Sequence, residues 1–335
     1  TAMPARLQHP AAKIIKNHVI QIPVHPHAGP YRVTAFRQTQ SPQATFQAFS
    51  TILRHQDRPG GWIGSPVPSR PHEPTGRVQE TLKEPISLAF VALGCAKNLV
   101  DSEKMLGQLA EAGAVITPDE ADADVIVVNT CGFLQASRAE AHQVIAEAVA
   151  RKRTGRCRRV VVAGCLVQRD GQNLLDDIPG IDALVGVHRR DDVVRAALAG
   201  MDRRPARKPR KTARPHADLY LGRYHPYVAL DTARLRITPR HYAYLRISEG
   251  CDQKCTFCTI PAIRGTMHCK PPEVVLAEAR ELIADGTREL NLIGQDTTGY
   301  GRDIGYKPGL AGLLRRLNRL DGLRWIRLLY AYPSV

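Results

Sequence analysis

The sequence predicts an α/β protein made of two successive β/α units: a parallel-sheet domain, then the first half of a β/α barrel. From residue 86 onward, short apolar runs typical of buried strands alternate with longer helical segments. A Pro/Arg/Lys-rich stretch at 200–216 interrupts this alternation and separates the units. The second unit holds only three strands, too few to close a barrel, so we expect half of one.

The first unit is expected at residues 85–200. Its strands are expected near 86–93, 125–128, 160–163 and 181–185, and its helices near 101–112, 135–152, 170–176 and 190–199. Asp101 or Ser102 is expected to cap the first helix, and Gly113 to close it. Alternating strands and helices predict a parallel sheet covered by helices.

The second unit is expected at 239–335, after a basic linker at 201–238. Its strands are expected at 242–247, 289–293 and 324–330, and its helices at 272–285 and 309–320.

Residues 1–84 contain 11 of the 24 prolines and show no sustained strand or helix period. We expect a disordered extension or one without a packed core. They hold ten Lys/Arg against four Asp/Glu, and residues 202–214 hold seven against one, so these segments carry most of the +15 net charge. A basic chain is compatible with ribosome or RNA contact. The alternative is that two flexible segments happen to be basic.

The remaining composition narrows the class of protein. No run of 18 apolar residues is present, so no membrane span is expected, and no secretory signal follows Thr1. Eight cysteines without an export signal favour metal or catalytic use over disulfides. We therefore expect a cytoplasmic protein.

Three cysteines, Cys251, Cys255 and Cys258, lie in a short loop directly after the first strand of the second unit. Three thiolates bound to a [4Fe–4S] cluster leave one iron without a protein ligand. That iron can be chelated by the amino and carboxylate groups of S-adenosylmethionine (SAM). The alternative is a zinc site, for which Cys269 is the only further cysteine nearby.

A second triad, Cys95, Cys131 and Cys165, is spread along the first unit, but each cysteine directly follows a predicted strand. Loops after parallel strands meet at one edge of a sheet, so the three cysteines are expected to converge. Adjacent glycines, Gly94 among them, permit the tight backbone that such a site needs. A second [4Fe–4S] cluster is the natural inference, and three buried structural cysteines are the alternative.

The Cys251–Cys258 loop resembles the defining motif of the radical SAM superfamily. Two such triads in this order resemble the methylthiotransferase family within it, over residues 86–335. Three strings resemble the branch that modifies an aspartate of the small-subunit ribosomal protein S-twelve: LGCAKNLVDSE (93–103), SEGCDQKCTFCTIP (248–261) and QDTTGYGRD (295–303). The tRNA-adenosine branch usually has Gly-Cys-Gln-Met-Asn at 94–98. The family's second barrel half and C-terminal β domain have no counterpart in these 335 residues.

The resemblance implies a transferase with two [4Fe–4S] clusters and SAM, used once to methylate a sulfur and once to generate a radical. The radical would abstract hydrogen from the aspartate β-carbon, an unactivated C–H with no acidic proton. The ribosomal protein or ribosome, and an electron donor such as flavodoxin or ferredoxin, would be partners. Lys97 and Asn98 would lie around the first cluster, and Phe257, Gln295 and Asp296 at the SAM site. Arg264 would contact a carboxylate or cap its loop.

Two other functions remain open at this point. One is a tRNA methylthiotransferase, with the same chemistry on another substrate. The other is a non-catalytic zinc or nucleic-acid-binding module. Cys157 and Cys269 have no partner in the sequence pattern and are expected to be free thiols.

Overall fold

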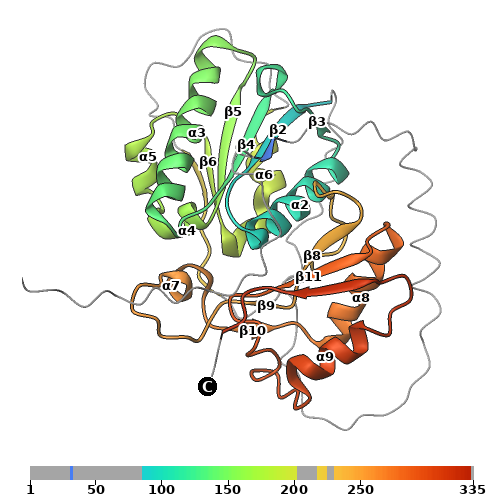
Figure 1. Cartoon of the computed structure of the whole chain (residues 1–335). Coiled ribbons are helices and arrows are strands. Elements are labelled where there is room, and N and C mark those ends of the chain that lie inside the picture. Colours follow the sequence, from blue (N-terminus) through green and yellow to red (C-terminus); the bar gives the residue numbers. More distant parts are fainter. Residues whose placement is uncertain (1–30, 33–84, 202–216, 225–229, 333–335) are drawn as a thin grey trace, which may run out of the picture.

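The computed structural model describes residues 31–32, 85–201, 217–224 and 230–332. Two α/β units lie one above the other, the first in blue to yellow-green and the second in orange to red (Figure 1). The predictions for the rest of residues 1–84 and for 202–216 fall outside the described residues.

The first unit is a helix-covered sheet with strand order β1-β2-β4-β5-β6-β7, in which β3 also pairs with β2. All pairs are parallel except β1–β2. The strands are β1 (Tyr31–Arg32), β2 (Ser87–Ala92), β3 (Val115–Ile116), β4 (Val125–Thr130), β5 (Arg159–Gly164), β6 (Ala183–Gly186) and β7 (Asp218–Tyr220). The helices are α2 (Ala96–Glu111), η1 (Glu120–Asp122), α3 (Gln135–Thr154), α4 (Cys165–Asp170), α5 (Asn173–Asp177), η2 (Val187–Asp192) and α6 (Val193–Leu198).

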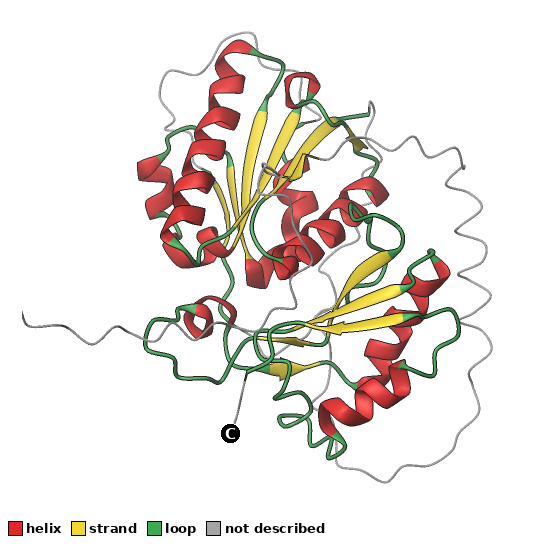
Figure 2. Cartoon of the chain, in the orientation of Figure 1, coloured by secondary structure: helices red, strands yellow, loops and turns green. Residues whose placement is uncertain are grey.

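Both faces of this sheet are buried. Along β2, Leu88 and Phe90 belong to the core cluster shared with α2 and α6, whereas Ala89 and Val91 belong to the cluster shared with α3, α4 and α5. Successive strand residues point to opposite faces, so a strand covered on both sides is continuously apolar. Figure 2 shows the yellow strands between the two layers of red helices.

The second unit is a three-stranded parallel sheet with order β12-β11-β8, formed by β8 (Tyr242–Arg246), β11 (Glu289–Ile293) and β12 (Trp325–Leu328). Helices α8 (Pro272–Ala284) and α9 (Gly309–Leu317) pack on it through residues such as Val275 and Leu313. A small antiparallel ladder of β9 (Ser248–Glu249) and β10 (His268–Cys269), with α7 (Ile260–Arg264), surrounds the cysteine loop. The expected half barrel is therefore present.

The structure corrects three local expectations. Helix α2 begins at Ala96 with Cys95 as its N-cap, so Asp101 and Ser102 lie inside the helix and do not cap it. Gly94, at φ +96°, turns the chain directly from β2 into this helix. The short helix expected near 170–176 is α5, and an unexpected helix, α4, begins before it at Cys165. In the expected linker, β7 adds a strand beside β6.

A strip of chain before β8 packs along α2 and joins the units. A Cβ at Gly107 of α2 would lie 2.2 Å from the Ala233 carbonyl oxygen, so this contact requires glycine. Leu235 N–H donates to the Glu103 carbonyl (3.0 Å), and Arg234 pairs with the Glu103 carboxylate (3.4 Å). In the described part of the chain, none of the helices has the length and apolar character needed to cross a membrane.

Candidate functional site

The first cysteine triad lies at one edge of the first sheet. Cys95 caps α2 after β2, Cys131 directly follows β4, and Cys165 begins α4 after β5. These strands are adjacent and parallel, with Ala92 beside Asn129 and Thr130 beside Gly164. The three loops therefore emerge side by side at the carboxyl edge, as the sequence predicted.

Glycines let these loops approach one another. A Cβ at Gly94 would lie 2.8 Å from the Cβ and 3.4 Å from the Sγ of Cys131. A Cβ at Gly132 would lie 2.7 Å from the Cys165 carbonyl oxygen, and one at Gly164 would lie 2.6 Å from the Thr130 carbonyl oxygen. Each cysteine loop is thus pressed against the next, with no room for a side chain between them.

Buried amides hold the Cys95 loop. Asn98 Nδ2 donates to the Leu93 carbonyl (2.5 Å), while Asn129 Nδ2 donates to the Asn98 carbonyl (3.0 Å) and to Ser102 Oγ (2.8 Å). Asn98 therefore supports the backbone on which Cys95 is mounted. Of the three cysteines, Cys95 is exposed, Cys131 is half-buried and Cys165 is buried. Burial raises the pKa of the Cys165 thiol to about 11, against the opposing effect of Arg264.

The second triad lies in the loop between β9 and α7, at the carboxyl edge of the second sheet. Cys251 N–H donates to the Gly265 carbonyl (3.1 Å), and Cys258 N–H donates to the Cys255 carbonyl (3.0 Å). Gly250, at φ +70°, lies so close to the Thr266 carbonyl that no side chain fits. Burial raises the pKa of Cys251, and the neighbouring Asp296 carboxylate, Cys258 and Cys255 act in the same direction.

The residues expected at the SAM site surround this loop. Asp296 is buried, and its carboxylate accepts hydrogen bonds from Gln253 Nε2 (2.9 Å), Thr298 Oγ1 (2.5 Å) and two backbone N–H groups. It thereby fixes Gln253, which lies between Cys251 and Cys255. The side-chain amide of Gln295 accepts a hydrogen bond from Lys97 and donates one to Glu249. Phe257 is 80% exposed, so its ring faces open space.

The donor set of each triad fits a four-iron cluster. In such a cluster each thiolate binds its own iron, so three cysteines supply three of the four irons. One triad lies in a single loop and the other at one sheet edge, so each brings three thiols to one side of its sheet.

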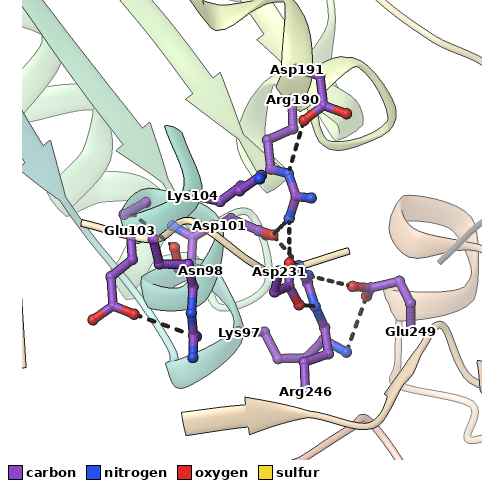
Figure 3. Close-up of polar contacts among 12 residues, drawn as sticks. Lys97, Asn98, Asp101, Glu103, Lys104, Arg190, Asp191, Asp231, Arg246 and Glu249 are labelled. Atoms are coloured by element: carbon purple, nitrogen blue, oxygen red, sulfur yellow. Dashed lines mark hydrogen bonds and ion pairs between the residues drawn. The ribbon is translucent and has the colours of Figure 1, made fainter. Parts of the chain in front are cut away.

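A buried network of charged side chains connects the two cysteine sites (Figure 3). Lys97, two residues after Cys95, donates from Nζ to the Ser248 carbonyl (2.6 Å) and to Gln295 Oε1 (2.8 Å), and its Nζ lies 3.2 Å from Glu249 Oε1. Ser248 and Glu249 immediately precede the Gly250–Cys251 turn. Lys97 is expected near the first cluster, and its side chain also reaches the second cysteine loop.

Carboxylates from both units complete this network. Asp101 of α2 accepts from Arg190 (2.7 Å), Arg246 (2.7 Å) and Arg264 (2.9 Å). Figure 3 shows Asp101 and Asp231 between the guanidinium groups of Arg190 and Arg246. The guanidinium of Arg246 holds the pKa of Asp231 well below its usual range despite burial, with Lys270 and Arg190 acting in the same direction. Ionic contacts therefore fix the units together.

Sequence reasoning did not identify Asp101, Asp231 and Glu249 as members of the site. Glu249 lies inside the quoted string 248–261, which is a signal that could have identified it. Asp231 carries no such signal, because only the fold brings its segment to the interface. The two extra cysteines, Cys157 and Cys269, are both buried. Burial raises the pKa of Cys269 to about 12, and its Sγ accepts from Gly301 N–H (3.3 Å).

Each cysteine triad lies within a region that matches a known protein family. Residues 87–186 match the model described as uncharacterized protein family UPF0004, and residues 245–330 match the radical SAM superfamily. The ribosomal protein uS12 methylthiotransferase RimO of Geobacter sulfurreducens is 45% identical over 254 residues, covering 75% of this chain and 54% of that protein. The RimO protein of Symbiobacterium thermophilum is 45% identical over 253 residues, covering 75% and 49%.

The chain therefore has a UPF0004 region followed by a radical SAM region, and it is similar to the RimO methylthiotransferases. It spans about half the length of the curated relatives it matches. Among solved structures it resembles the radical S-adenosylmethionine methyltransferase TsrM of Kitasatospora setae, at 16% identity and a TM-score of 0.46, over 72% of this chain and 54% of that one. That likeness is too weak to bear on fold or function.

Proposed function

We propose that this chain is part of a radical SAM methylthiotransferase that adds a methylthio group to the β-carbon of an aspartate on a small-subunit ribosomal protein. The main support for this proposal is the arrangement of the two cysteine triads. One triad lies at the carboxyl edge of each parallel sheet, and the ion pair of Lys97 and Glu249 connects the two sites. The order of the triads is that of the methylthiotransferase family, whose similar members are named for activity on uS12.

The six cysteines would hold two [4Fe–4S] clusters. Cys95, Cys131 and Cys165 would bind the first, and Cys251, Cys255 and Cys258 the second, each leaving one iron open. When bound, the clusters and SAM would supply the sulfur to be transferred and the radical that abstracts hydrogen. The chain would orient these groups and exclude water.

Three further residues would act at the SAM site, in two different ways. Asp296 and Gln295 have protein partners for their polar groups, so they would shape the site by fixing the cysteine loop and Lys97. Phe257 is exposed directly between Cys255 and Cys258, so its ring would be available to pack against the cofactor.

The aspartate substrate fits the charge of this region. The network contains five cations, Lys97, Arg190, Arg246, Arg264 and Lys270, and their carboxylates include the half-buried Glu249 and the exposed Asp191 at its edge, so the buried cations outnumber the buried carboxylates. A carboxylate substrate would be favoured by such a field, whereas a modified adenosine would need an apolar, stacking pocket. We propose the ribosome as the partner, with RNA contacts made by the basic segments. The electron donor would be a flavodoxin or ferredoxin, and the protein would act in the cytoplasm.

The first test is metal content. The full-length protein, reconstituted anaerobically with iron and sulfide, should hold about eight irons per chain. Replacing Cys251, Cys255 and Cys258 by Ala should remove half of the iron and leave the first cluster. Zinc without iron in the reconstituted protein would refute the proposal in favour of a zinc module.

The second test identifies the substrate. The full-length protein is expressed in cells lacking their own enzymes of both branches, and mass spectrometry measures methylthio addition on the ribosomal protein and on tRNA. Modified ribosomal protein, lost in the Cys251→Ala variant, is expected. Modification of tRNA alone would replace the proposed substrate while retaining the radical SAM assignment.

A further inference from the structure

Residues 217–224 run from the first unit to the second cysteine site. Their strand, β7, pairs with β6 in the first sheet. Beyond β7, Gly222 lies close against η2: a Cβ at Gly222 would be 2.7 Å from Arg189 Cγ, and the Gly222 carbonyl accepts from Gln168 Nε2 (3.2 Å). The first unit thus anchors this stretch two residues before Tyr224, whose side chain reaches the second unit.

The Tyr224 ring covers Gly265, the residue directly after α7. A Cβ at Gly265 would collide with Cδ2 and Cε2 of this ring, and Gly265 has a φ of +80°, so the contact requires glycine. The Tyr224 hydroxyl donates to the Thr266 carbonyl (3.0 Å) and lies 2.9 Å from Thr266 Oγ1. Tyr224 therefore holds two successive residues of the second unit, one by its ring and one by its hydroxyl.

His188, in η2 directly after β6, holds the end of α7. Its Nε2 lies 3.1 Å from the Ile263 carbonyl oxygen, and because a carbonyl only accepts, Nε2 donates in this contact. The His188 ring also meets the Tyr224 ring edge to face, with centroids 5.5 Å apart. The two side chains therefore act together on residues 263–266 of the second unit.

Residues 263–266 support one end of the second cysteine loop. Cys251 N–H donates to the Gly265 carbonyl (3.1 Å), so the position of Cys251 depends on this segment. The other end of the loop has its own hydrogen bond, from Cys258 N–H to the Cys255 carbonyl (3.0 Å). A shift of residues 263–266 would therefore move Cys251 away from the other two cysteines.

We propose that His188 and Tyr224 are positioning residues of the second cysteine site, holding Cys251 where all three thiolates can bind one [4Fe–4S] cluster. This inference rests on the proposed function. A cluster with three thiolate ligands has no spare protein ligand, so displacement of one thiolate weakens its binding. Residues that orient metal ligands without binding the metal typically change its affinity by about 10–100-fold. The second site is then complete only with side chains that the first unit supplies or anchors.

The test measures how fast the second cluster loses its iron. The full-length protein carrying Cys95→Ala, Cys131→Ala and Cys165→Ala is reconstituted anaerobically, so that only the second site holds iron, and a chelator of ferrous iron is added in excess. Tyr224→Leu removes both the ring and the hydroxyl and should raise the rate of iron release about tenfold or more. Tyr224→Phe keeps the ring over Gly265 and should raise the rate about threefold.

The His188 contact is tested by a pair of variants. His188→Leu removes the donor to the Ile263 carbonyl and should also raise the rate about tenfold. His188→Gln can still donate from Nε2 to that carbonyl, so it should restore most of the slow release. Loss of ring packing alone would affect the two variants equally, and equal rates would overturn the role of this hydrogen bond.

Tyr220→Leu is the matched control. Tyr220 lies in β7 of the same stretch, but it packs against the core of the first unit and its ring faces Arg195 (5.4 Å). Its loss should lower the melting temperature and leave the rate of iron release within about twofold of the parent. Equal acceleration in Tyr220→Leu and Tyr224→Leu would show that general destabilisation releases the iron, which would overturn the inference.

The remaining outcomes separate this inference from the proposed function. If Tyr224→Leu does not fold, Tyr224→Phe decides: a release rate equal to that of the parent overturns the inference. An unchanged rate in folded, iron-loaded Tyr224→Leu protein would overturn the inference and leave the proposed function intact. A parent protein whose second site binds no iron overturns both, and the iron assay reveals this before any chelator is added.

Discussion

Replacing Lys270 by Met should destabilise the protein strongly, although Lys270 is not among the proposed cluster ligands or SAM-site residues. The Lys270 side chain is completely buried, and its Nζ lies 2.8 Å from Asp231 Oδ2 and 2.7 and 2.5 Å from the two Glu278 carboxylate oxygens. Both carboxylates are 2% exposed. Asp231 retains Arg246 and Arg190, but Glu278 loses the only cation paired with it among the described residues.

The expected magnitude follows from that stranded carboxylate. Removing one partner of a buried ion pair typically costs about 3–5 kcal/mol, because the remaining charge stays desolvated. With about 2–4 °C per kcal/mol for 150–250 residues, the melting temperature should fall by roughly 6–20 °C. Urea unfolding should show a lower midpoint at an unchanged slope.

Lys152→Met provides the matched control. Lys152 pairs with Asp182 at 2.6 Å, a similar distance, but both side chains are about a quarter exposed. Its removal should cost about 0–1 kcal/mol, because solvent screens the pair. The double variant Lys270→Met/Glu278→Gln should recover part of the loss. Equal losses for Lys270→Met and Lys152→Met, or no recovery in the double variant, would show that burial of the charge is not the cause.

Three further predictions concern the two cysteine sites. Gly132→Ala places a Cβ 2.7 Å from the Cys165 carbonyl oxygen, so it should remove the first cluster and about four of the eight irons. The control Gly171→Ala meets nothing within 4 Å and is strained only by its own φ of +56°, so it should lower stability slightly but retain the iron in the same assay. Burial lowers the pKa of Lys97 from 10.5 to about 8, so between these pH values the unfolded chain binds the Lys97 proton more tightly than the folded protein does. The free energy of unfolding, compared with that of Lys97→Met by urea unfolding at each pH, should therefore rise by roughly 3 kcal/mol from pH 8 to 10.5. A difference that stays constant with pH would show that burial does not lower this pKa. Asp296→Asn weakens the hold on Gln253 and should lower iron at the second site, measured in a protein whose first triad is replaced by Ala. Full iron occupancy in that protein would show that the loop holds its shape without that carboxylate.

The architecture was predictable because the strands are buried on both faces. A continuous apolar run such as Val160–Ala163 predicts a buried parallel strand from its own sequence, even when the neighbouring strands are not known. Once these strands were recognised, the convergence of Cys95, Cys131 and Cys165 followed from topology alone, and the parallel order of β2, β4 and β5 confirms that the three lie at one edge. Whether they bind a cluster stays a prediction.

The start of α2 and the ion network were not predictable for a common reason. Asp101 resembles an N-cap in sequence, because a short carboxylate before a helical pattern usually caps. Here its carboxylate accepts from Arg246 and Arg264, which lie 145 and 163 residues away. No local pattern carries that information. A polar residue with a plausible local role was therefore assigned wrongly, since its partners come from the other unit.

Lys97 shows why three separate strings of sequence belong together. It lies in the first string, and its ammonium group contacts the Ser248 carbonyl in the second and Gln295 in the third. These partners are 151 and 198 residues away, yet they bind one buried cation. A methionine at position 97 would leave Gln295 and the Ser248 carbonyl without this donor, so the residues of one string constrain those of the others. The resemblance to one branch of the family therefore has a physical counterpart: the three strings form a single contact between the two cysteine sites.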